Sequence, residues 1–207
     1  MKLLALDTST EYLSLALWQD GAVIVREMLA QQKHSSLILP LLREVLHEAG
    51  LQLTDLDGIA FGAGPGSFTG LRIACGVAQG LAFGANLPVV GLCTLEALAE
   101  QSGADKVIAC LDARMGEVYY AAYVRKNAAW VEVRAPSLCH PTELPKVEGD
   151  GWCGIGSGWD VYAEILNTTY PATHVIPNAF PLARYIAALA APIFAAGGGE
   201  SAHEAHP

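Results

Sequence analysis

The feature that most constrains this chain is a glycine-rich turn between an apolar run and a long uncharged segment. Residues 62–72, GAGPGSFTGLR, follow the apolar run 56–61, which predicts a buried strand. Four glycines and a proline predict a tight strand-to-helix turn whose backbone approaches another group closely. Ser67 or Thr69 can cap the helix that follows. The turn has neither the Lys-Ser/Thr pair of a phosphate loop nor the third glycine of a dinucleotide fingerprint.

The segment after the turn, residues 73–85, predicts a helix with two rows of small side chains. The rows are Gly76, Gly80, Gly84 and Ala74, Ala78, Ala82. Glycine costs a helix roughly 1 kcal/mol relative to alanine, but a stripe of small residues lets another helix approach closely. Between residues 58 and 95 the only charged residue is Arg72, and a helix without charge on any side is normally buried on every side. Two interpretations stay open: a helix at the centre of this chain's core, or a helix with one face covered by another subunit.

Composition limits the classes of function. The chain has 207 residues, 52% of them hydrophobic and 16% charged, with a net charge of −9. An acidic chain without basic clusters binds nucleic acid poorly by itself, so any RNA should be held by another protein. The five cysteines form no Cys-x-x-Cys pair, which favours reduced thiols over disulfides or a zinc ribbon. Because there is no signal-like start and no apolar run of membrane length, we expect a cytoplasmic protein without a membrane span.

The first half of the chain predicts a strand meander followed by alternating helices and strands. Strands are expected at 2–6, 12–18 and 22–28, with a hairpin turn at Asp20-Gly21. A helix capped by Ser35 or Ser36 and ending near Ala49 comes next. The strand 56–61, the helix 73–85, a short strand at 89–92 and a helix at 94–101 complete this half.

The second half repeats the order of elements. A buried strand at 107–111 ends at Asp112, as the first strand ends at Asp7. Strands at 118–124 and 129–134, a short helix near 142, a glycine-rich strand end at 154–158 and helices at 159–166 and 181–191 follow. We therefore predict an α/β protein with two lobes, 1–103 and 104–195, related by duplication of element order. The low-complexity tail, 196–207, is expected to be disordered.

Five sequence stretches resemble the TsaB (YeaZ) family of tRNA threonylcarbamoyladenosine biosynthesis proteins. They are LLALDTST (3–10), HSSLILPLL (34–42), GAGPGSFTGLRI (62–73), PVVGLCTLEALA (88–99) and LDARMGEVYYA (111–121). These stretches cover most of the first lobe and the start of the second. The C-terminal end departs from the family pattern, which ends in a Pro-x-Tyr-x-Arg-like sequence. The role of the last fifteen or so residues is therefore left open.

The resemblance implies an actin-like ATPase-clan fold with two ribonuclease-H-like lobes. In that clan a nucleotide lies between the lobes, near acidic strand ends. The corresponding positions of a vestigial nucleotide cleft are Asp7, Thr8, Ser9, Asp112, Gly154 and Gly156. The DTST loop has no glycine where kinases of the clan have one to wrap a phosphate. The alternative for Asp7 is that its carboxylate caps the loop of the first hairpin.

The sequence offers no catalytic or metal-binding constellation of its own. The catalytic relative TsaD binds a metal through a His-x-x-x-His pair on a helix, and this chain has no such pair. A metal site needs three or four convergent ligands. Ser67 is better explained as a helix cap than as a nucleophile, because no base can be assigned to it. We expect no catalytic residues, no metal and no cofactor, with ATP and metal on partner proteins.

The resemblance implies a non-catalytic scaffold that pairs with TsaD for threonylcarbamoyl transfer to the adenosine beside the tRNA anticodon. TsaE would dock on this pair, the chain alone would form a homodimer, and tRNA would be bound only through the complex. The alternative is a catalytic member of the same clan, either a small-molecule kinase or a metallopeptidase-like enzyme. Tight binding of ATP or of a metal ion would favour that alternative.

Two helices are expected to form one exposed apolar patch for the partner. The expected partner-binding residues are Leu37, Ile38, Leu41, Leu42, Val45, Arg72, Cys75, Gly76, Gln79, Gly80 and Phe83. Large exposed apolar patches mark sites where a partner binds. Because a cation at a helix start is disfavoured by the helix dipole, Arg72 is expected to have a carboxylate partner, in this chain or across the interface.

Overall fold

The computed structural model describes residues 1–170 and 174–207, which form two compact units. The first unit is Met1–Thr94 with Pro181–Pro207, and the second is Leu95–Phe180. The chain therefore passes between the units at residues 94–95 and 180–181. The boundary expected near residue 103 lies nine residues too late, because helix α3 (Thr94–Ser102) belongs to the second unit from Leu95 onward.

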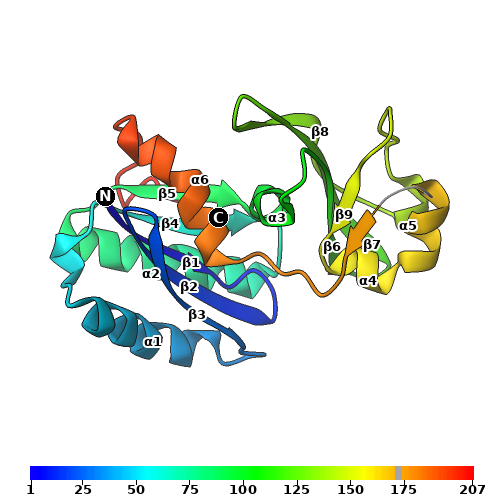
Figure 1. Cartoon of the computed structure of the whole chain (residues 1–207). Coiled ribbons are helices and arrows are strands. Elements are labelled where there is room, and N and C mark those ends of the chain that lie inside the picture. Colours follow the sequence, from blue (N-terminus) through cyan, green and yellow to red (C-terminus); the bar gives the residue numbers. More distant parts are fainter. Residues whose placement is uncertain (171–173) are drawn as a thin grey trace. The chain divides into compact units, whose positions relative to one another are not determined.

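The first unit is a five-stranded sheet covered by helices on both faces (Figure 1). Its strand order is β3-β2-β1-β4-β5, formed by β1 (Lys2–Asp7), β2 (Tyr12–Gln19), β3 (Ala22–Leu29), β4 (Gly58–Gly64) and β5 (Val89–Cys93). The first three strands are antiparallel, and β1, β4 and β5 run parallel. Asp20 and Gly21 both have positive φ, at 49° and 94°, as expected for the tight hairpin turn between β2 and β3.

Helices α1 (His34–Ala49) and α2 (Phe68–Ala85) pack on one face of this sheet. Gly50, with a φ of 67°, ends α1 in the left-handed conformation. A short 3-10 turn, η1 (Leu53–Asp55), leads from α1 into β4. The N-cap of α1 is Lys33, without a side-chain cap hydrogen bond, so the expected serine cap is wrong. The hydroxyl of Ser36 instead donates to the Lys33 carbonyl oxygen at 2.9 Å.

Helix α6 (Ala183–Ala195) covers the other face of the first sheet. The amide of Ala183 donates to Ser14 Oγ at 2.8 Å, and the Phe194 ring occupies the space above Gly58. Arg184 also pairs with Glu27 on β3. The expected assignment of this helix to the second lobe is wrong. It belongs to the first unit, because it covers the open face of the first sheet.

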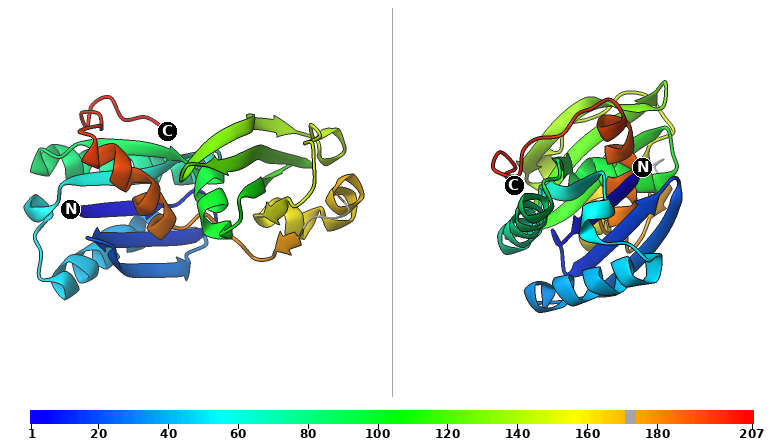
Figure 2. Two further views of the ribbon diagram at one scale, coloured as in Figure 1. Left: turned by 45° about the horizontal axis from the view of Figure 1, so that its top comes forward. Right: turned by 90° about the vertical axis from the view of Figure 1, so that its left-hand side faces the viewer.

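The residues after α6 pack on the first unit (Figure 2). Val89 and Glu200 form an antiparallel bridge at the outer edge of β5, and Ala205 is 6% exposed. The expected disorder of residues 196–207 is therefore wrong for this part of the chain.

The second unit contains a sheet with the same topology. Its order is β10-β9-β6-β7-β8, formed by β6 (Lys106–Arg114), β7 (Glu117–Lys126), β8 (Ala129–Cys139), β9 (Cys153–Ile155) and β10 (His174–Ile176). β6, β7 and β8 are antiparallel, while β9 and β10 run parallel to β6. The 3-10 turn η2 (Pro141–Glu143) and helices α4 (Ser157–Val161) and α5 (Ala163–Thr169) complete the unit. Because each sheet is a meander followed by two parallel strands, the predicted duplication of element order is confirmed.

Candidate functional site

Helix α2 presents its glycine row on the surface of the first unit. Gly76, Gly80 and Gly84 are exposed, and a Cβ atom added at any of them would meet no atom within 4 Å. The alanine row, Ala74, Ala78 and Ala82, is fully buried against the sheet. The expectation that this helix is buried on every side is therefore wrong. Its lack of charge reflects an exposed row without side chains from Gly76 to Gly84, over about two turns.

Two exposed aromatic rings flank the glycine row. Phe68 and Phe83 are 70% and 68% exposed. The Arg72 guanidinium lies over the Phe68 ring, 3.4 Å from its centroid, a cation–π arrangement. Within residues 1–170 and 174–207 Arg72 forms no ion pair, so the expected carboxylate partner is not supplied by the described part of this chain.

Most of the α1 residues expected in the partner patch are buried within this chain. Ile38, Leu41, Leu42 and Val45 lie in the core of the first unit, and Leu37 is partly buried against it. Cys75 on α2 is also buried, at 4% exposure, and Gln79 is half-buried. These positions were misassigned because an amphipathic helix buries its apolar stripe in its own core before any partner reaches it.

The surface that remains consists of Arg72, Gly76, Gly80, Gly84, Phe68, Phe83 and, on α1, Leu39. We call the α2 members of this set the glycine-row face. Phe68 and Gly84 are absent from the expected partner-binding residues, although Gly84 belongs to the small-residue row and both continue the four-residue spacing of Arg72, Gly76 and Gly80. Leu39, 44% exposed, gives no signal in sequence because it is a single apolar residue outside the stripe.

The loop after β1 is held by its own hydrogen bonds. The Ser9 amide and hydroxyl both donate to Asp7 Oδ1, at 2.9 and 2.7 Å. The Thr8 hydroxyl donates to the Gly70 carbonyl oxygen at 2.6 Å, and the Ser67 amide donates to the Ser9 carbonyl oxygen at 2.7 Å. These contacts support the alternative interpretation of Asp7, in which its carboxyl caps the loop.

The glycine-rich turn makes room for this loop. A Cβ atom at Gly70 would overlap the Thr8 carbonyl oxygen, and one at Gly66 would lie 2.6 Å from the Ser9 carbonyl oxygen. Ser67 caps α2 by accepting from the Gly70 amide at 3.4 Å, as the sequence predicts. The close approach predicted for this turn is therefore made to the chain's own first loop.

Asp7 itself is fully buried, and burial raises its pKa to about 6. Its hydrogen bonds from Ser9 lower the pKa but only partly offset the desolvation. Its second oxygen, Oδ2, has no hydrogen-bond partner among the described residues. Asp7 therefore keeps its proton to a higher pH than an exposed aspartate does.

Asp112 in the second unit repeats this local arrangement. The amide of Arg114 donates to Asp112 Oδ1 at 3.0 Å, two residues along as Ser9 is from Asp7. The Tyr162 hydroxyl also donates to Asp112 Oδ1, at 3.3 Å, and Arg114 pairs with Oδ2. Each aspartate therefore accepts a hydrogen bond from the backbone amide two residues further on. The expectation that the strand ends at Asp112 is wrong, because β6 continues to Arg114.

The space beside the glycines expected to face an adenosine is filled by other residues of this chain. A Cβ atom at Gly154 would lie 2.5 Å from the Trp159 indole, and one at Gly156 would overlap the Cys110 carbonyl oxygen. The Trp159 Nε1 donates to the Ile108 carbonyl oxygen at 3.0 Å, which fixes the ring in place. The space beside Gly154 and Gly156 is therefore filled by residues of the second unit itself.

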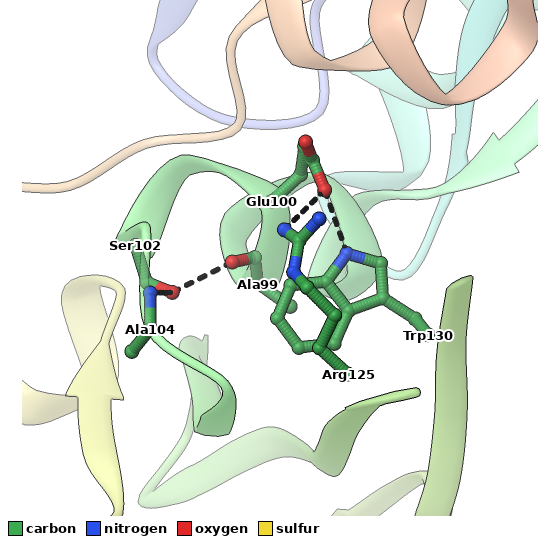
Figure 3. Close-up of polar contacts among 6 residues, drawn as sticks. All are labelled: Ala99, Glu100, Ser102, Ala104, Arg125 and Trp130. Carbon is green, nitrogen blue, oxygen red and sulfur yellow. Dashed lines mark hydrogen bonds and ion pairs between the residues drawn. The ribbon is translucent and has the colours of Figure 1, made fainter. Parts of the chain in front are cut away.

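A separate polar cluster fixes α3 to the second sheet (Figure 3). Glu100 Oε2 accepts from Arg125 at 2.7 Å and from Trp130 Nε1 at 2.8 Å, while the guanidinium lies 4.3 Å from the Trp130 ring centroid. One carboxylate oxygen thus joins helix α3 to β7 and β8, which indicates a structural role.

The described residues contain no group of three or more His, Cys, Asp or Glu side chains arranged to hold a metal ion. None of the helices in residues 1–170 and 174–207 is long and apolar enough to cross a membrane.

Comparison with known proteins agrees with this architecture. The family model described as "TsaD: tRNA N6-adenosine threonylcarbamoyltransferase" matches residues 25–198. The tRNA threonylcarbamoyladenosine biosynthesis protein TsaB of Escherichia coli is 42% identical over 175 residues, covering 80% of this chain and 75% of that protein. TsaB of Haemophilus influenzae is 39% identical over 193 residues, covering 86% and 82%. The solved structure of YeaZ from Pseudomonas aeruginosa is 37% identical with a TM-score of 0.92, covering 100% and 98%.

Two lobes of this topology define a protein of the actin-like ATPase type, as the family resemblance implies. Within that class, the chain belongs to the TsaB (YeaZ) family.

Proposed function

We propose that this chain is a non-catalytic subunit in tRNA threonylcarbamoyladenosine biosynthesis, pairing with TsaD through the glycine-row face of α2. The observation that carries the proposal is the open row at Gly76, Gly80 and Gly84 between two exposed phenylalanines. A helix interior glycine costs stability, so three on an exposed face call for a compensating function. Close approach of a partner helix is such a function.

The family names support the biological setting of this proposal. The relatives in Escherichia coli and Haemophilus influenzae carry the name of this tRNA modification, and the matching family model is that of TsaD. In our proposal TsaE docks on the pair, the isolated chain forms a homodimer through the same face, and the complex works in the cytoplasm. The net charge of −9 supports binding of tRNA only through the complex.

We further propose that the chain uses no nucleotide or metal of its own. In the 7–9 loop, the Thr8 hydroxyl and the Ser9 hydroxyl and amide donate hydrogen bonds within the protein. The Trp159 ring fills the space beside Gly154. The alternative, a kinase or a metallopeptidase-like enzyme of the same clan, requires tight ATP or metal binding. Isothermal titration of the purified chain with Mg-ATP and with Zn²⁺ separates the two, since micromolar binding of either would favour the enzyme.

The test of the pairing proposal is Gly80→Leu. A Cβ atom at position 80 meets no other atom within 4 Å, so unfolding should stay cooperative while the dissociation constant for TsaD rises at least tenfold. Asn167→Leu, which adds the same side chain at an exposed position of α5, is the control and should pair normally. Unchanged pairing of Gly80→Leu would refute the glycine-row face as the interface.

Reconstitution tests the biosynthetic role. Mixtures of TsaD, TsaE, the adenylate-forming enzyme and tRNA should form modified adenosine only when this chain is added. Full modification without it would remove the proposed role, and hydrolysis of ATP or peptide by the chain alone would favour the alternative.

A further inference from the structure

The last residues of the chain dock on the first unit beside the glycine-row face. After α6, the segment 199–207 pairs with the edge strand β5 at Glu200 and then contacts α2. The Val89 amide donates to the Glu200 carbonyl oxygen at 2.9 Å, and the Glu200 amide donates to the Val89 carbonyl oxygen at 2.8 Å. This pairing extends the first sheet by one short bridge at its edge strand.

Nearer the end of the segment, three residues of α2 that are four positions apart contact it: Cys75, Gln79 and Phe83. The Ala205 carbonyl oxygen accepts from Gln79 Nε2 at 2.6 Å and lies 3.7 Å from the Cys75 thiol. The Ala205 side chain is buried in the core of the first unit. The His203 ring lies edge-on to Phe83, with 5.3 Å between ring centroids.

These contacts place the segment next to the glycine row without covering it. Each residue that contacts the segment stands one position before a glycine of the row: Cys75, Gln79 and Phe83. Two of them also stand three positions after a glycine of the row, Gln79 after Gly76 and Phe83 after Gly80. Residues three apart on a helix are surface neighbours, so the two rows run side by side along α2. The glycine row stays open with the segment docked.

The segment is held by few contacts. A cavity of about 390 Å³ lies where it meets the end of α2, lined among others by Phe83, Asn86 and His203. Apart from Ala205, its residues from Ser201 onward are exposed or only half-buried. An element with little buried surface has low local stability, so we expect a charge at the buried Ala205 to release it.

We propose that residues 199–207 form one wall of the docking surface, which receives a helix of the TsaD partner along the glycine row. This inference rests on the proposed function. A row without side chains from Gly76 to Gly84, about 12 Å long, suits a helix at close approach. Arg72, the one charged residue of α2, is unpaired within the described chain and complements a carboxylate on that helix. The segment fixes the Phe83 ring and adds His203 to the contact.

The experiment measures TsaD binding by the full chain carrying Ala205→Asp. This substitution places a charge at the buried position of the Ala205 side chain. Pro207→Asp adds the same charge at an exposed position of the segment and is the matched control. Hydrogen exchange of the Val89 amide reports whether the segment is docked, because that amide donates to Glu200. Deletion of 199–207 is the second variant, should Ala205→Asp leave the segment in place.

We expect Val89 exchange to rise and TsaD binding to weaken about tenfold in Ala205→Asp or in the deletion, with Pro207→Asp unchanged. Unchanged binding with a released segment would show that the wall is not part of the surface. Tighter binding would show that the segment is an inhibitory cover, which also overturns the proposal. If the parent chain itself does not bind TsaD, the proposed function fails instead, so the two failures are distinguished.

Discussion

The carboxyl group of Asp7 lies directly against Gly62, so that a Cβ atom at position 62 would overlap Asp7 Oδ2. Gly62 opens the glycine-rich turn, and Asp7 ends the neighbouring parallel strand. The start of the turn and the first loop therefore pack directly against each other, and Gly62 makes room for an aspartate that caps its own loop.

Gly62→Ala should destabilise the protein by about 1–3 kcal/mol, the usual cost of overpacking a core. The added methyl meets both Asp7 and Thr94, neither of which has space to withdraw because both are fully buried. Gly76→Ala is the control. It fills open space on an exposed helix face and should raise the free energy of unfolding by about 0.5–1 kcal/mol. Urea unfolding followed by circular dichroism compares the two, and equal stabilities would contradict the close contact.

Asp7→Asn should remove a pH dependence of stability between about pH 4 and pH 6. Burial raises the folded-state pKa of Asp7 from 3.8 to about 6, so in this range the folded state holds a proton that the unfolded state has lost. The contribution of Asp7 is then fully present below pH 4 and falls as the pH rises through 6. Two pKa units correspond to about 3 kcal/mol.

The measurement is the difference in unfolding free energy between the parent chain and Asp7→Asn at several pH values. This difference should shift in favour of the variant from pH 4 to pH 6 and stay constant above pH 7. Asp57→Asn, at an exposed position of the same unit, controls for loss of a carboxylate. A difference independent of pH would show that Asp7 titrates normally.

Arg72→Ala should weaken pairing with TsaD while changing stability by less than about 1 kcal/mol. The guanidinium touches an exposed ring, and cation–π contacts at exposed sites contribute about 0.5–1 kcal/mol. Arg114→Ala removes an arginine that is 78% exposed in the second unit and is the matched control. Pairing and tRNA binding are assayed separately. Direct tRNA binding by the isolated chain that disappears with Arg72 would contradict an interface role.

Glu100→Ala should destabilise the second unit by about 1–2 kcal/mol. The change leaves the Arg125 guanidinium and the Trp130 indole N–H without their shared acceptor (Figure 3), and removal of one hydrogen-bond partner from a partly buried group costs this amount. Glu164→Ala, an exposed glutamate of α5, should have no effect. Tryptophan fluorescence during urea unfolding reports the change, and equal midpoints for both variants would show that the cluster is dispensable.

Local chemistry in the sequence determined much of the first unit. The Asp20-Gly21 hairpin, the αL glycine after α1 and the Ser67 cap follow from backbone preferences that act over a few residues. The motif spanning 62–73 indicated the family for a related reason, since Gly66 and Gly70 leave room for the backbone of the first loop. Element order alone was enough to predict the duplicated topology of the two sheets.

Tertiary packing decided which surfaces remain for a partner. The periodicity of α1 and α2 shows that one face of each is apolar or small, but not what covers it. The structure buries Ile38 and Val45 in the core and leaves Gly76 and Gly80 open. The same reason explains why α6 was assigned to the wrong lobe and why the docking of Ala205 was not predicted. Contacts between residues more than one hundred positions apart leave no local pattern, because they depend on which faces are still open once the sheets have formed.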